Sequence, residues 1–475
     1  MSARPIGFAL RLVCVALLAG CGESGAPAAP PPADLVIHDA TVFDARARTT
    51  LAHRTVVIED ARIAVVLGPG EPIPDARATI EARGRLLTPG LIDVHSHSAD
   101  VLGDSISTGG GFISRLSMDP DSIAAYRRRY AAAYLPYGVT TVRDVGSDDR
   151  QLPMLTAWME RSQDAPDFWP SGGALVSAEE GRVPYPGHRV VTSPEDVRRV
   201  VRAYHDAGLR HIKLYWRLRE PEFVAALDEA RTLGMHVTGH IDFKVLGFER
   251  ALDLGLRSFE HAYTVGVGAL SEERYRTAQQ EDLARVIGDD PRGRFYLSVF
   301  AYMHALGSDN PEMERLIGRL AETHSTVVPT LHIFAQRLGL TIHVTPTSGV
   351  FDDLTWLDED QRTWAIEGYE ILARYVQEMW EAGIPLAVGT DWAEPGPATL
   401  SEIALLHAAG IPMTDSLAIA TLGGATAIGV EDEVGAIEPG YRANLVLWEG
   451  DPLADPRALL GGRIVIKDGR TWAAE

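Results

Sequence analysis

The chain has 475 residues, of which 46% are hydrophobic and 23% are charged, and its formal net charge is -21. This composition is typical of a globular protein and argues against extensive disorder. The acidic balance excludes a nucleic-acid-binding protein, because phosphate binding requires clustered Lys and Arg. Cys14 and Cys21 are the only cysteines, so disulfides, thiol catalysis and thiolate metal ligands are excluded from the rest of the chain.

Residues 1–20 resemble a lipoprotein signal peptide. Arg4 and Arg11 precede an apolar run, residues 12–20, that is too short to span a bilayer as a helix. The sequence LAGC at 18–21 resembles a lipoprotein cleavage box, which implies that Cys21 becomes the first mature residue and carries lipid. An ordinary secretory signal with a chance cysteine is the alternative.

Residues 21–33 are rich in Gly, Ala and Pro, which predicts a flexible tether. No later segment is long and apolar enough for a transmembrane helix. We therefore expect an exported bacterial lipoprotein that faces the periplasm or the cell exterior. The lipid on Cys21 would be its one contact with the membrane.

The pattern of predicted secondary structure divides the body of the chain into three parts. Both ends are predicted to form β-strands, and a long middle part is predicted to alternate strands and helices. Residues 34–88 alternate in short strand-like runs, and residues 434–475 return to the same pattern. Between them, over residues 89–433, capped helical segments alternate with short apolar runs, about eight times. This alternation predicts an α/β fold, a (β/α)8 TIM barrel, beside a small β-sandwich built from both ends of the mature chain. The third strand, near SGGALVSAEEG, has the weakest pattern.

Polar residues occur at the ends of the predicted barrel strands. Active sites of such barrels lie at the carboxyl ends of their strands, and the side chains expected there could bind two metal ions. LIDVHSH places two imidazoles on one face of a strand, because side chains alternate across it. The candidate metal ligands are His95, His97, Lys213, His240, His261 and Asp391.

Charge arithmetic favours a modified lysine in this site. Two divalent ions bring four positive charges, whereas Asp391 and a bridging hydroxide bring one negative charge each. A carbamate on Lys213 would add another negative charge and two oxygens, and buried lysines lose their proton readily. The alternative is a mononuclear site in which Lys213 forms a salt bridge. Nitrogen and oxygen ligands suit Zn, or else Mn, Co or Fe.

Several motifs together resemble the amidohydrolase superfamily, in particular its imidazolonepropionase-like and Xaa-Pro dipeptidase (prolidase-like) branch. They are TPGLIDVHSH, GVTTVRDVG, IKLY, GHI, LDLGLRSFEH, GTD and GAIEPGYRANLVLWEGDPL. The resemblance implies that His95, His97 and Asp391 bind the more buried ion. It further implies that His240 and His261 bind the more exposed ion, and that Lys213 bridges both as a carbamate.

Two further residues are candidates for substrate binding. His188 follows the third strand, where relatives carry a Gly-His, although PGH here departs from their usual GGH. Tyr215 lies two residues after Lys213, on the same strand face, and could donate a hydrogen bond to substrate or simply pack at the barrel mouth. His332 could line the pocket, and Arg143 is expected to tie the second strand to its neighbours.

The chemistry that these residues predict is hydrolysis by a metal-bridging hydroxide, with Asp391 moving a proton to the leaving nitrogen. The expected substrate is a small amide: a dipeptide, an N-acyl amino acid or a cyclic amide. A lactonase or esterase could use the same site, and a catalytically inactive binding lipoprotein is the rival from another class. The complete ligand set argues against that rival. The oligomeric state stays open, and a homo-oligomer is compatible with the sequence.

Overall fold

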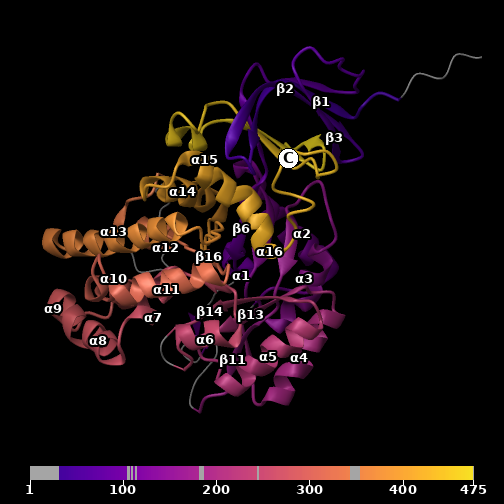
Figure 1. Cartoon of the computed structure of the whole chain (residues 1–475). Helices are drawn as coiled ribbons and strands as arrows, with labels where there is room; N and C mark the ends of the chain where they lie inside the picture. Colours follow the sequence, from indigo (N-terminus) through magenta and orange to yellow (C-terminus); the bar gives the residue numbers. More distant parts are fainter. Residues whose placement is uncertain are drawn as a thin grey trace, which may run out of the picture.

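The computed structural model describes residues 31–103, 107–108, 111–112, 115–180, 187–242, 245–342 and 354–473. The expected signal peptide, Cys21 and nearly all of the tether lie outside these residues. Figure 1 shows a large α/β body beneath a smaller β domain that contains both ends of the described chain. Within the described residues, no helix is long and apolar enough to cross a membrane.

The α/β body is built around parallel strands that follow one another in chain order. Neighbouring strands pair in parallel register from the first position to the seventh, apart from an interruption in the third. These strands are β6 (Leu91–Ser96), β9 (Val139–Asp144), β10 (Asp167–Pro170) with β11 (Ala174–Ser177), β13 (His211–Tyr215), β14 (His236–His240), β15 (Ser258–Glu260) and β16 (Thr326–Val328).

The eighth position is an irregular segment, residues 385–391, that closes the ring. Leu386 forms a parallel bridge with Val327 of β16. On the other side, the amide of Val94 in β6 donates to the carbonyl of Val388 at 2.9 Å, and the amide of Asp391 donates to the carbonyl of His95 at 2.8 Å. The expected barrel is therefore present, with an eighth strand that follows an irregular course.

The third barrel position, which has the weakest sequence pattern, is interrupted. β10 pairs with β9, whereas β11 pairs with β13 and with an additional strand, β12 (His188–Val191). Gly172 lies between β10 and β11 with φ of 69°, a conformation that breaks an extended strand and that glycine adopts readily. His188 therefore begins a strand of its own beside β11.

Helices surround the strands, and five of the described α-helices, namely α2, α4, α8, α11 and α13, begin at a residue whose side chain caps the helix. Ser193 caps α4 by accepting from the amide of Asp196, and Asp358 forms a capping box with Gln361 at the start of α13. The helices are α1 (Ser98–Val101), α2 (Pro120–Tyr134), α3 (Leu152–Trp158), α4 (Pro194–Asp206), α5 (Glu220–Thr232), α6 (Phe248–Leu254), α7 (Tyr263–Ala269), α8 (Glu272–Thr277), α9 (Leu283–Ile287), α10 (Arg294–Leu306), α11 (Pro311–Glu322), α12 (His332–Ala335), α13 (Glu359–Glu381), α14 (Pro395–Ala408), α15 (Met413–Ala418) and α16 (Gly424–Ile428).

The β domain joins strands from both ends of the chain. β5, near the N-terminal end, pairs in antiparallel register with β17, near the C-terminal end. All its strands belong to one hydrogen-bonded sheet, and side chains from both halves of that sheet pack into a single core. The strands are β1 (Leu35–Asp44), β2 (Thr49–Glu59), β3 (Arg62–Leu67), β4 (Thr79–Glu81), β5 (Leu86–Pro89), β17 (Leu445–Trp448), β18 (Arg463–Lys467) and β19 (Arg470–Thr471), and a separate short hairpin is formed by β7 (Ser107–Thr108) and β8 (Gly111–Phe112).

Candidate metal centre

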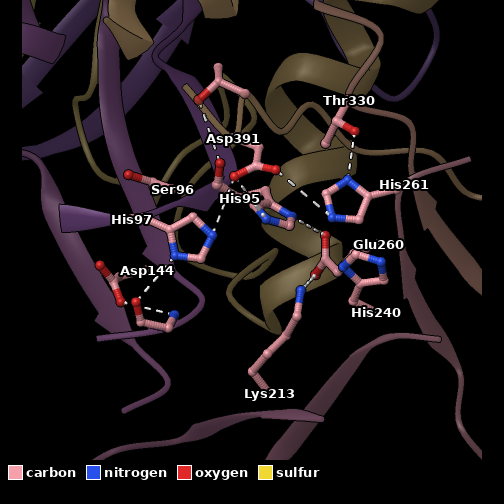
Figure 2. Close-up of polar contacts among 12 residues, drawn as sticks. His95, Ser96, His97, Asp144, Lys213, His240, Glu260, His261, Thr330 and Asp391 are labelled. Atoms are coloured by element: carbon pink, nitrogen blue, oxygen red, sulfur yellow. Dashed lines mark hydrogen bonds and ion pairs between the residues drawn. The ribbon is translucent and has the colours of Figure 1, made fainter. Parts of the chain in front are cut away.

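The six candidate ligands converge at one end of the barrel. Because parallel strands deliver their carboxyl ends to one rim, residues far apart in the sequence meet there. Figure 2 shows Asp391 between His97 and His261, with His95 beneath it. Ring centroids are 5.4 Å apart for His95 and His97, 4.7 Å for His95 and His261, and 4.5 Å for His261 and His240.

Three imidazoles direct the same nitrogen toward the Asp391 carboxylate. Nε2 lies 3.7 Å from an Asp391 oxygen in His95, 3.3 Å in His97 and 3.9 Å in His261. One possible ligand atom from each of His95, His97 and Asp391 lies within 4.8 Å of the others. Two imidazoles and a carboxylate at this spacing are a ligand set that suits a divalent metal ion.

The opposite nitrogen of each of these rings is held by a neighbouring group. Nδ1 lies 2.7 Å from Glu260 Oε2 in His95, 3.2 Å from a backbone carbonyl in His97 and 2.8 Å from Thr330 Oγ1 in His261. The carboxylate and the carbonyl can only accept, so Nδ1 of His95 and His97 carries the proton. Nε2 is therefore the nitrogen that can bind a metal once it carries no proton, and the group that holds Nδ1 fixes the orientation of the ring.

His240 differs from the other three histidines in the nitrogen that is available to a metal. Its Nε2 lies 3.0 Å from the hydroxyl of Tyr263, so Nδ1 is the atom that it can present to a metal. Burial is the main cause that lowers the pKa of His240 well below its usual value and that of His261 to about 3. Both rings are therefore neutral near pH 7, which is the form that binds metal.

His97 and Asp391 form a charged pair when no metal is bound. Burial disfavours the charge on His97, but the hydrogen bond that its Nε2 donates to Asp391 and the negative charge of that carboxylate outweigh burial and raise the pKa of His97 to about 9. Burial likewise opposes the charge on Asp391, yet His95 and His97 hold the pKa of this carboxyl well below its usual range. Metal binding at His97 would consequently release a proton.

Lys213 is buried at the floor of the site with no hydrogen-bond partner for Nζ among the described residues. Its side chain is 2% exposed, and Nζ lies 3.8 Å from Glu260 Oε1. Burial is the largest cause that lowers the pKa of Lys213 to about 8. An orphaned amine that loses its proton near neutral pH fits a carbamate, because only the neutral amine adds carbon dioxide and two new oxygens would satisfy the site.

Glu260 is a central residue that the sequence patterns did not single out. It is fully buried and links His95 and Lys213 to Arg143, whose Nη2 donates to Glu260 Oε1 at 2.7 Å. Arg143 also donates to the carbonyl of Val94 at 2.7 Å, which ties β9 to its neighbours as expected. The feature of the sequence that could have identified Glu260 is a carboxylate at the end of a predicted strand, directly before His261.

Replacing Glu260 with Gln should destabilise the protein strongly. The substitution removes the carboxylate charge between Arg143 and Lys213, which remain buried, and such a loss costs about 3 to 5 kcal/mol. Chemical denaturation of the metal-free protein measures the effect. Glu249→Gln is the matched control, because Glu249 pairs with Arg315 on the surface, where an ion pair contributes about 0 to 1 kcal/mol. Equal stability of the two variants would contradict a structural role for Glu260.

The backbone at the rim adopts uncommon conformations. His261, Thr330 and Asp391 have φ values of 65°, 53° and 48°, which non-glycine residues rarely adopt and which cluster at functional sites. Gly389 allows the eighth segment to approach β6, because a Cβ there would lie 2.6 Å from Cβ of His95. Asp93 fixes this approach by accepting from the amide and the hydroxyl of Thr390 at 3.1 and 2.7 Å.

One of the two predicted substrate-binding residues, Tyr215, lies next to His240, and the other, His188, packs against Tyr215. The rings of Tyr215 and His240 are 4.9 Å apart, and those of Tyr215 and His188 are 4.6 Å apart. Burial is the main cause that lowers the pKa of His188 to about 4, so its imidazole is neutral. His332 is buried instead against Trp392, the residue after Asp391, at 5.5 Å between rings.

A cavity of about 520 Å³ opens beside this group. Tyr215, His240 and Tyr263 line its inner side, and α8 and α10 supply much of the rest. The volume falls in the range of small-molecule sites. A ligand in this cavity would therefore contact a candidate metal ligand directly.

Comparison with known proteins identifies the family. The family model described as "Amidohydrolase family" matches residues 86–267 and 300–471. The chain belongs to the amidohydrolase family. Divalent metals are general in this superfamily, and the His95, His97 and Asp391 cluster agrees with that chemistry.

Solved amidohydrolase structures share the whole fold. A putative prolidase from Bifidobacterium longum is 24% identical, with a TM-score of 0.64 and coverage of 93% of this chain and 95% of that one. A Xaa-Pro dipeptidase with bound methionine is 20% identical, with a TM-score of 0.62 and coverage of 92% and 99%. At these identities the likeness establishes the fold, which is the barrel with an additional domain.

Sequence relatives match over shorter stretches. The imidazolonepropionase of Geobacillus kaustophilus is 32% identical over 108 residues, which are 19% of this chain and 25% of that protein. The chain spans between 15% and 25% of the length of the curated relatives that it matches. The family match confirms the resemblance to the amidohydrolase superfamily, and the proteins to which the chain is similar include imidazolonepropionases and prolidases.

Proposed function

We propose that this protein is a metal-dependent hydrolase that cleaves the amide bond of a dipeptide, an N-acyl amino acid or a cyclic amide. The observation that carries the proposal is the convergence of three imidazole Nε2 atoms on Asp391, above a buried lysine amine without a hydrogen-bond partner. Family membership and the prolidase-like fold support the choice of a carbon–nitrogen bond.

The proposed metal centre would hold two divalent ions, with Zn the expected metal. His95, His97 and Asp391 would bind one ion and His240 and His261 the other, and a carbamate on Lys213 would supply further oxygen ligands. When bound, the ions would polarise the scissile carbonyl and lower the pKa of water to roughly 7. Neutral imidazoles at His240 and His261, the low-pKa carboxylate of Asp391 and a buried lysine amine with a lowered pKa form a donor set that fits this role.

The protein's own residues would orient substrate and move protons. Asp391 is ionised and faces the centre of the site, so it would accept the proton of the attacking water and pass it to the leaving nitrogen. Tyr215 lies beside His240 and His188 packs against Tyr215, and either could hydrogen-bond to the substrate carbonyl or carboxylate. The adjoining cavity would hold the part of the substrate that does not react.

We also propose that the protein works outside the cytoplasm, tethered by lipid on Cys21. The basis is the sequence of residues 1–33 alone. Small peptides and scavenged amides are the amide substrates that such an enzyme would meet.

A panel of amides, and of esters and lactones with similar shapes, tests the proposed function. The purified protein, supplied with Zn and bicarbonate, is assayed on dipeptides, N-acyl amino acids and cyclic amides, and on esters and lactones of similar shape. We expect amide hydrolysis that disappears with a chelator and returns with metal. Cleavage of esters and lactones alone would replace the amidase by a lactonase or esterase. Failure to cleave any compound would favour the binding lipoprotein.

A further inference from the structure

The cavity beside His240 has an outer wall made by a segment that no motif explained. α8, the π-helical turn η3 (Ala278–Asp282) and the start of α10 all face the cavity. Their chain lies within residues 264–306, between strands β15 and β16. Because loops and insertions at this end of a barrel determine specificity, this wall should select the substrate.

Aromatic side chains dominate the cavity. Tyr275 and Tyr302 stack at 4.8 Å between ring centroids, and Tyr263 meets Phe295 edge-on at 6.3 Å. Phe295 is 55% exposed and adds its ring to the aromatic side chains that line the cavity. The aromatic lining consists of Tyr215, Trp216, Tyr263, Tyr275, Phe295 and Tyr302. Such a surface favours a planar, apolar group.

Arg294 is the one arginine that lines this cavity, and its guanidinium makes no ion pair with any described residue. The neighbouring arginines are all neutralised: Arg274 and Arg285 pair with Asp282, and Arg292 pairs with Asp290. Asp242 is the other charged residue that lines the cavity. An arginine left unpaired in a partly buried cavity is suited to a carboxylate, which it can bind with two hydrogen bonds.

We propose, building on the proposed hydrolase function, that this cavity binds the leaving half of the substrate as an aromatic amino acid whose free carboxylate pairs with Arg294. In an N-acyl amino acid or a dipeptide, the free carboxylate belongs to the amine side of the scissile bond. Water adds to the acyl carbon, the carbon–nitrogen bond breaks, and the leaving nitrogen takes up a proton. The substrate class is therefore N-acyl aromatic amino acids and dipeptides with a C-terminal aromatic residue. Asp242 disfavours a second carboxylate on that residue.

Kinetics with paired substrates test this assignment in the metal-loaded protein. N-acetylphenylalanine carries the carboxylate, N-acetyl-2-phenylethylamine has the same ring without it, and N-acetylproline has the carboxylate without the ring. We expect N-acetylphenylalanine to be the best of the three. Arg294→Gln should lower its kcat/KM by roughly 10- to 100-fold, the value of a hydrogen-bonded charge pair. The same variant should change N-acetyl-2-phenylethylamine by less than about threefold, because that substrate lacks the interaction.

Arg285→Gln is the matched control, since it removes an exposed arginine from the adjacent helix α9. It should leave all three rates unchanged. Equal loss on both aromatic substrates, or a preference for N-acetylproline that ignores Arg294, would overturn the cavity assignment and leave the hydrolase intact.

A binding measurement separates this inference from the proposed function. 3-Phenylpropanoate has the ring and the carboxylate but no amide, and calorimetry follows its binding directly. Arg294→Gln should weaken that binding roughly 10- to 100-fold, whereas Arg285→Gln should not. Arg294-dependent binding without hydrolysis of any amide would uphold the cavity assignment and reject the hydrolase. Binding that Arg294→Gln leaves unchanged would reject the cavity assignment.

Discussion

Asp391→Asn should lower kcat for amide hydrolysis by roughly 100- to 10,000-fold, the range for loss of a general acid–base group. Asn has nearly the shape of Asp but cannot accept and return a proton at pH 7. The carboxylate faces three imidazoles at 3.3 to 3.9 Å, so no other described carboxylate is placed to replace it at the centre of the site. Steady-state kinetics measure the loss on the best amide substrate found.

The loss of activity must be separated from loss of metal. Metal content is therefore measured on the same preparation, and the variant is also assayed with excess metal. Asp432→Asn is the matched control, because Asp432 is exposed and remote from the barrel rim. An Asp391→Asn protein that keeps its metal and its full rate would refute the proton-transfer role of Asp391.

Lys213→Ala should abolish activity and weaken metal binding by at least about 100-fold. Mutation of residues that only hydrogen-bond to metal ligands already lowers metal affinity by about 10- to 100-fold. Loss of a carbamate that binds both ions should lower it at least as much. The reason for expecting a carbamate is the buried Nζ without a hydrogen-bond partner and the pKa of about 8. Metal titration and activity are measured together.

Lys213→Arg distinguishes the carbamate from a salt bridge. Arg keeps the positive charge toward Glu260, which lies 3.8 Å from Nζ, but it does not form a carbamate. If Lys213 acts as a cation, the Arg variant should retain metal and activity. If it acts as a carbamate, both variants should fail, and a short carboxylic acid such as propionate should restore part of the activity of Lys213→Ala.

The barrel and the position of the candidate ligands followed from local sequence patterns. LIDVHSH and HVTGHI predict strands that end in imidazoles, and the rule that parallel strands end at one rim brings them together. The structure places His95, His97, His240, His261 and Asp391 in that arrangement. Local periodicity was sufficient for the ligands that lie within or directly after a regular strand, whereas Asp391 ends the irregular segment 385–391.

Long-range contacts were not predictable in the same way. Glu260 stands next to a recognised ligand, yet its role depends on Arg143, 117 positions earlier in the chain. The interruption of the third strand depends on the φ of Gly172, which many glycines in loops also adopt. The cavity wall depends on how α8 and α10 pack over His240, and neither helix carries a motif. Such features come from packing between distant segments.

Metal content of the purified wild-type protein is the most direct test of the binuclear site. The protein is prepared from its mature body without chelators, dialysed, and analysed by mass spectrometry for divalent metals per chain, before and after supply of Zn and bicarbonate. We expect close to two ions per chain in the supplied protein, with His95, His97, Lys213, His240, His261 and Asp391 as ligands. A protein that binds no divalent metal under any supply would contradict it.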